Sequence, residues 1–207
     1  MTRAYRIAMH SQTQRPSFLD DQEIARTARA VLAGTMLSAQ DEEFARPRLY
    51  VSGPYQGRYV RGELHHLRQY SVTDSGEVLP PPVLMGRVFD VSTDDQGRKT
   101  ETELTGEGLD LLCLTEAYTI AEDGTVTSAS SSLRDVLTSP VYREVLGGQT
   151  RFFFHFPNLF FKKDGFYCLK HSIFEQSSLP ENPAGGQYVV QAKCAGRPLH
   201  VALQRRG

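Results

Sequence analysis

Residues 151–176 read RFFFHFPNLFFKKDGFYCLKHSIFEQ, the part of the sequence that is most informative about the fold. Seven of the eleven phenylalanines of the chain lie between Phe152 and Phe166. Polar residues nevertheless interrupt the aromatic run at 157–158 and again at 162–165. Phenylalanine side chains dominate the energetics of protein cores, so a block of this density needs a place to be buried.

The two interruptions divide the stretch into three predicted strands, at 152–156, 159–161 and 166–174. The first is predominantly apolar, which predicts that both of its faces are covered. We therefore expect the aromatic block to be core, packed between two sheets, with a basic turn at 162–165. Side-chain alternation places four residues of the third strand on one face: Tyr167, Leu169, His171 and Ile173.

The composition is that of a globular domain. The chain has 207 residues, of which 40% are hydrophobic and 23% charged. A chain of this length and composition can bury a hydrophobic core without stabilising disulfides or metal ions. Its three cysteines are widely spaced, which favours reduced thiols in an intracellular protein over a disulfide. No apolar run reaches the roughly 18 residues of a membrane helix, and residues 1–12 lack a signal-peptide pattern.

Charge is distributed unevenly along the chain. The net charge is −1, but residues 1–70 carry +3, residues 71–150 carry −9 and residues 151–207 carry +5. Such asymmetry indicates either a face that attracts polyanions or a solvated acidic middle without a target. Charge alone favours the second interpretation.

One helix is predicted in the N-terminal half. Ser17 is a suitable N-cap, and apolar residues then recur at three-to-four spacing, which predicts a helix over about 18–40. The proline run 80–82 leads into a predicted strand over 83–91, followed by a polar loop over 92–108.

The remaining chain is dominated by strand signals. A buried strand is predicted over 109–120, whereas 133–146 is predicted to be either a short helix or irregular. Shorter strands are predicted at 49–51, 59–60, 64–72 and 188–192. Many short strands and few helices predict a mainly β protein, a β-sandwich with one helix in its N-terminal half.

Four blocks of this sequence together resemble the velvet domain of fungal regulators. The last two are the most specific because together they need no gap over about twenty residues. The resemblance covers roughly residues 79–195. It implies that residues 1–207 form a single velvet-like domain. Residues 13–78 would then be an insertion or an extension that contains the predicted helix. The first strand of the family then lies either near residue 5 or near residue 60. The blocks are Pro80–Val83, Leu111–Gly124, Phe153–Gly165 and Phe166–Glu175.

The resemblance implies a fold and a function class. Velvet domains are β-sandwiches similar to the immunoglobulin-like Rel-homology domain. They act in the nucleus, with a cytoplasmic pool, as regulators of sporulation, sexual development and secondary metabolism. They form homodimers and heterodimers with other velvet-type proteins, and some bind double-stranded promoter DNA. No cofactor, small-molecule substrate or membrane is implied.

Six basic residues are the candidate DNA contacts. Three of them are interleaved with Tyr59, His65 and His66, a mixture typical of nucleic-acid or protein interfaces, and two occupy the turn that cuts the aromatic block. Residues 71–79, which precede the PPPV motif, contain two acids and no base, unlike the family pattern. The alternative is a velvet-fold interaction partner with little or no DNA binding of its own. The candidates are Arg15, Arg58, Arg61, Arg68, Lys162 and Lys163.

No enzyme motif accompanies these residues. The sequence has no nucleophile elbow, HExxH, P-loop or dinucleotide fingerprint. The adjacent pair His65-His66 would face opposite ways on a strand, which argues against a shared metal. His155 and His171 are predicted to be buried and hydrogen-bonded. We therefore expect no catalytic residues, metal or cofactor.

Overall fold

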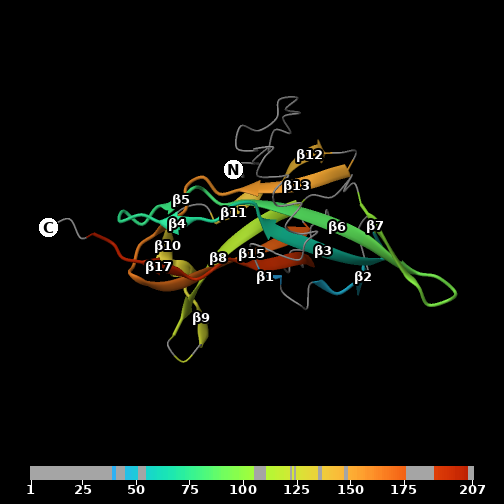
Figure 1. Cartoon of the computed structure of the whole chain (residues 1–207), viewed down its shortest axis with the longest axis horizontal. Helices are drawn as coiled ribbons and strands as arrows, with labels where there is room; N and C mark the ends of the chain where they lie inside the picture. Colours follow the sequence, from blue (N-terminus) through green and yellow to red (C-terminus); the bar gives the residue numbers. More distant parts are fainter. Residues whose placement is uncertain are drawn as a thin grey trace, which may run out of the picture.

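Two β-sheets pack face to face in the computed structural model of the chain (Figure 1). The structure describes residues 39–40, 45–50, 55–104, 111–121, 123, 125–134, 137–146, 149–175 and 189–204. Strands dominate this described part, which confirms the predicted mainly β sandwich. None of its helices is long and apolar enough to cross a membrane.

The first sheet has seven strands in the order β1-β16-β15-β8-β11, with β17 also paired to β15 and β9 to β8. Its longest member, β15, pairs antiparallel with β8 along nine residues, from Tyr167–Thr119 to Glu175–Leu111. The strands are β1 (Ala39–Gln40), β8 (Leu111–Ile120), β9 (Val126–Ser128), β11 (Thr138–Pro140), β15 (Gly165–Glu175), β16 (Val189–Ala195) and β17 (Leu199–Val201).

The second sheet has six strands in the order β12-β13-β6-β3-β2, with β7 paired to β6. Two small sheets, β4-β5 and β10-β14, extend the sandwich at one end, and the short 3-10 helix η1 (Ser130–Ser132) precedes β10. The strands of the second sheet are β2 (Arg48–Leu49), β3 (Tyr59–His66), β6 (Val83–Thr93), β7 (Lys99–Glu103), β12 (Tyr142–Leu146) and β13 (Gln149–His155). The small sheets contain β4 (Ser71–Val72), β5 (Val78–Leu79), β10 (Leu133–Arg134) and β14 (Phe160–Phe161).

The aromatic block is core, as the sequence predicts. Phe152 and Phe154 point between the sheets, where they join Leu84, Cys113 and Ile173 in one buried cluster. Phe153 points the other way and packs with Leu67, Val83, Met85 and Tyr142. Strand β13 is therefore covered on both faces. Tyr167, Leu169, His171 and Ile173 are each at most 2% exposed, which confirms the predicted buried face of β15.

Two segments that were not predicted to be strands, 92–108 and 133–146, contain strands in the structure, so both predictions are wrong. The predicted loop 92–108 contains β7, which forms a ribbon with β6 beyond a turn at Asp94–Gly97. All five residues of β7 are polar, so no apolar alternation marked it. The segment 133–146 is neither helical nor irregular but forms β10, β11 and β12, because pairing with β14, β8 and β13 overrides its local spacing.

The predicted helix over 18–40 ends too late. Ala39 and Gln40 form β1, which pairs with Ala195 and Cys194 of β16, so the last two residues of the prediction are strand. The rest of that prediction lies outside the described residues. Residues 59–66 form an inner strand of the second sheet, so this part of the predicted insertion or extension is integral to the sandwich.

Candidate nucleic-acid interface

The basic turn that interrupts the aromatic block is held rigidly at its backbone. The Lys162 N–H donates to the carbonyl of Ser132 at 2.8 Å, and the Asp164 carboxylate accepts the Leu203 N–H at 2.6 Å. The Tyr167 hydroxyl donates to the Asp164 carbonyl at 3.3 Å. The side chains of Lys162 and Lys163 are exposed. The turn therefore presents two solvated cations from a fixed backbone.

Two further groups flank this turn. Arg134 of β10 is exposed and pairs with Phe160, directly before the turn. Phe166, directly after it, is 59% exposed and stacks on His200 of β17 with ring centroids 4.6 Å apart. Exposed cations beside an exposed aromatic ring suit a nucleic-acid backbone and bases. Sequence spacing did not identify Arg134 or His200, because strand pairing alone brings them to the turn.

Arg58 and Arg61 lie elsewhere, at the start of β3, among carboxylates of the second sheet. Arg58 is 3.2 Å from Asp90 and its side chain is 53% exposed. Arg61 donates to Glu101 at 2.8 Å and to Glu63 at 2.6 Å, and its guanidinium lies 4.2 Å from the Phe89 ring centroid. Its side chain is only 16% exposed. Arg61 is thus engaged inside the protein rather than presented to a ligand.

Arg61 belongs to a larger ionic network on the outer face of the second sheet. Arg87 bridges Glu103 at 2.8 Å and Glu63 at 3.5 Å, and Arg151 also binds Glu103. The hydrogen bond to Glu101 raises the pKa of Arg61. Burial opposes ionisation of Glu63, but hydrogen bonds from His65 and Arg61 outweigh it and lower its pKa to about 2. Arg61 and Glu63 therefore stay charged across the physiological range.

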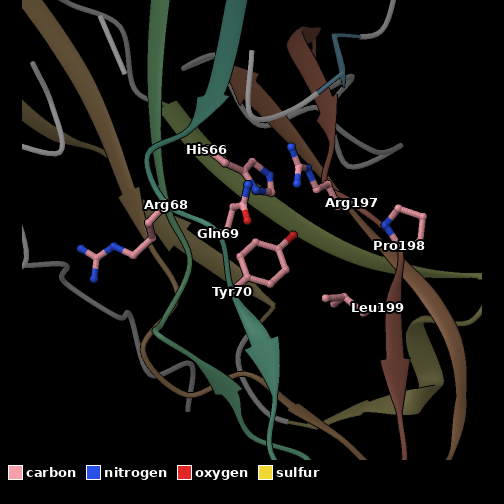
Figure 2. A pocket seen from close by; sticks show the side chains of 7 residues that line it. All are labelled: His66, Arg68, Gln69, Tyr70, Arg197, Pro198 and Leu199. Atoms are coloured by element: carbon pink, nitrogen blue, oxygen red, sulfur yellow. The ribbon is translucent and has the colours of Figure 1, made fainter. Parts of the chain in front are cut away.

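Arg68 follows β3 and borders a cavity at the edge of the sandwich. The cavity is lined by His66, Arg68, Gln69, Tyr70, Arg197, Pro198 and Leu199 (Figure 2). The Arg68 guanidinium points away from the other lining side chains, whereas the Arg197 side chain points toward His66. Arg15, the remaining candidate, lies outside the described residues.

The structure does not gather the six candidates into one surface. The lysine turn lies between β10 and β17, at the left of Figure 1, whereas β2, which pairs with the start of β3, lies at the right together with β7. The end that carries Lys162 and Lys163 also holds Arg134 and the Phe166–His200 pair. We call these five residues the end surface. Within the described part of the chain, no group of His, Cys, Asp or Glu is arranged to hold a metal ion.

The described structure is thus a β-sandwich that carries a basic, aromatic surface at one end. No protein-family model matches the chain. Among curated proteins, it is similar to one from Schizophyllum commune (strain H4-8 / FGSC 9210) named "Probable velvet family sexual development regulator". The two are 23% identical over 189 residues, covering 75% of this chain and 67% of the relative. That relative is named as a regulator, not as an enzyme.

Proposed function

We propose that this protein is a velvet-type regulator of development and secondary metabolism that acts in the nucleus and binds double-stranded DNA through its end surface. The similarity to a velvet family sexual development regulator carries the developmental role. The exposed lysine turn beside the Phe166–His200 pair supports the DNA contact. The whole chain, 1–207, acts as one velvet-like domain, with a cytoplasmic pool before nuclear entry.

The mechanism is phosphate anchoring by Lys162, Lys163 and Arg134. Each such contact releases condensed counterions, so affinity falls with salt by a slope of about 0.9 per phosphate neutralised. Asp164 partly offsets the local positive charge, although its carboxylate is engaged by the Leu203 N–H. A single protomer therefore binds DNA weakly, and dimerisation with a second velvet-type chain supplies further contacts.

The test is fluorescence anisotropy of the purified chain against a randomised duplex pool at several salt concentrations, followed by sequencing of the bound fraction. An enriched motif with a negative salt slope supports the proposal, and the slope bounds the number of phosphate contacts. Absence of binding at low salt, both alone and with a velvet-type partner, refutes it.

A second candidate function is an interaction partner that binds another regulator with little DNA contact. The observation favouring it is β12, one of the two edge strands of the second sheet as described, in which Val145 is 67% exposed. An exposed edge strand is a template for pairing with another chain. Light scattering distinguishes the two functions: tight association with a second velvet-type protein and no salt-dependent DNA binding supports the interaction partner.

A further inference from the structure

The cavity at the edge of the sandwich lies between the end of β3 and the segment that joins β16 to β17. Its volume is about 140 Å³. A water molecule takes about 30 Å³ in the liquid, so the cavity has room for a tetrahedral oxyanion with accompanying water. None of the seven described lining residues is acidic.

The polar groups of the cavity are mainly donors. In Figure 2 the Arg197 guanidinium, the Gln69 carboxamide and the Tyr70 hydroxyl surround one space beside His66. The Tyr70 hydroxyl oxygen is shielded from solvent and has no hydrogen-bond partner among the described residues. A buried hydroxyl without a partner is costly, and an entering acceptor removes that cost.

The charge of the cavity comes from arginine. Burial and the neighbouring His65 lower the pKa of His66 to about 4, so its imidazole is neutral near pH 7. Arg197 supplies a planar, permanently charged fork that suits paired oxygens. Three donor side chains, one of them a guanidinium, with no carboxylate among the described lining residues, select a negatively charged ligand rich in acceptor oxygens.

The cavity and the end surface both border β17. Leu199 lines the cavity and pairs with Tyr167, and two residues further Val201 pairs with Gly165, the last residue of the lysine turn. A polyanion held by Lys162 and Lys163 that runs along β17 therefore passes Arg197. The Phe166–His200 pair lies between them on the same two strands.

We propose that this cavity is a phosphate-binding site, with Arg197, Gln69 and Tyr70 as its donors, and that it holds one phosphodiester of bound DNA. The second half of the proposal rests on the DNA-binding function proposed above. The first half stands independently, because a phosphate group is recognised by the same donors whether it belongs to DNA or is free.

The phosphate half is tested by titrating the full chain with dimethyl phosphate at constant ionic strength and following amide and side-chain NMR shifts. We expect saturable shifts at Gln69, Tyr70 and Arg197. Arg197→Ala and Tyr70→Phe each weaken this binding by about tenfold. Arg98→Ala, which removes the same charge from the exposed tip of the β6–β7 ribbon, leaves it unchanged. Linear, non-saturating shifts, or equal shifts in all variants, overturn the site.

Tyr70→Phe separates a binding role from a structural one. Since the hydroxyl has no hydrogen-bond partner among the described residues, its removal leaves the unfolding midpoint unchanged or slightly raised while phosphate binding weakens by about tenfold. A variant that unfolds more easily, with unaltered phosphate affinity, assigns the hydroxyl to the fold and contradicts the proposal.

The DNA half is tested by anisotropy of the same variants. Arg197→Ala is expected to lower the salt slope by about one, and Arg98→Ala to leave it unchanged. DNA binding with an unaltered slope in Arg197→Ala refutes the phosphodiester assignment. Binding of dimethyl phosphate without any DNA binding leaves the phosphate site standing and refutes the proposed function instead.

Discussion

The Nδ1 atom of His171 lies 2.7 Å from the hydroxyl oxygen of Thr115, and both residues are completely buried between the sheets. The ring of His66 meets the ring of His171 edge to face, with centroids 4.7 Å apart. The sequence predicted a buried, hydrogen-bonded His171. The structure adds that two imidazoles occupy one buried site, where burial lowers the pKa of both; His65 lowers the pKa of His66 further, and His66 does the same for His171.

This pair predicts acid sensitivity. Burial lowers the pKa of His66 to about 4 and that of His171 well below its ordinary value, so the unfolded chain binds more protons than the folded one at mildly acidic pH. Stability is therefore full above about pH 6.5 and falls as the pH drops toward 4, with roughly 3 kcal/mol attributable to His66. Glu63, whose pKa is lowered to about 2, adds a loss of the same sign at still lower pH.

Urea unfolding at pH 7 and pH 5 checks the prediction. His171→Leu is expected to be less stable at pH 7 but to lose less stability on acidification. His200→Gln alters an exposed histidine and should retain the pH dependence of the parent protein. A parent protein equally stable at both pH values contradicts the interpretation.

Phe154 and Phe166 belong to the same aromatic block, but the first is buried and the second is exposed, so their substitutions are expected to differ in effect. Phe154→Ala empties a fully buried site between the sheets and is expected to cost about 3–5 kcal/mol in unfolding free energy. Phe166→Ala removes a 59% exposed ring and should cost less than about 1 kcal/mol, while weakening DNA binding. Chemical denaturation of both variants measures the contrast, and similar losses would disprove it.

Lys162 and Arg61 are predicted to differ in role although both were candidate DNA contacts. Lys162→Ala combined with Lys163→Ala should lower the DNA salt slope by about two and leave the melting temperature unchanged, because both side chains are solvated.

Arg61→Ala is expected to destabilise the fold by about 1–3 kcal/mol, because Glu101 and Glu63 lose a charged donor and Phe89 loses its cation. Thermal melts together with anisotropy distinguish the two outcomes. Arg98→Ala, 74% exposed, is the charge-matched control and should change stability by less than about 0.5 kcal/mol. If Arg61→Ala leaves the melting temperature unchanged and lowers the salt slope of DNA binding, Arg61 is a solvated DNA contact and our assignment of a structural role is wrong.

Gly76 and Gly97 form a matched pair for backbone effects. Both adopt a positive φ, of 86° and 78° respectively, so alanine strains either one. A Cβ at Gly76 would also collide with the carbonyl oxygen of Phe161, whereas at Gly97 it meets open space. We expect Gly97→Ala to cost about 1 kcal/mol and Gly76→Ala considerably more. Equal losses in urea unfolding would show that strain alone matters at both positions.

Several elements were predictable because their signal is local. Strands β6, β8, β13 and β15 are long, apolar or alternating, and bounded by turn residues, and the structure confirms each. The buried face of β15 followed directly from period-two alternation. By contrast, β7 is entirely polar, and β10 to β12 exist because of the partners they pair with, so local spacing predicted neither.

The same division applies to the candidate site. The exposure of Lys162 and Lys163 was predictable from the sequence, since a charged turn between two buried apolar strands must face solvent. The engagement of Arg61 was not, because Glu101 is forty residues away and reaches it only through the β6–β7 pairing. Arg197 and Tyr70, more than a hundred residues apart, border one cavity for the same reason.

The amino-acid pattern alone predicts that this chain buries an aromatic block between β-sheets, because hydrophobic burial and side-chain alternation are properties of a short stretch. The same pattern predicts where a solvated basic turn interrupts that block. Which cations are neutralised, which remain exposed and which line a cavity follows instead from the three-dimensional fold. Charge pairing depends on distances of a few ångströms between residues that are remote in the chain, and strand register alone sets those distances.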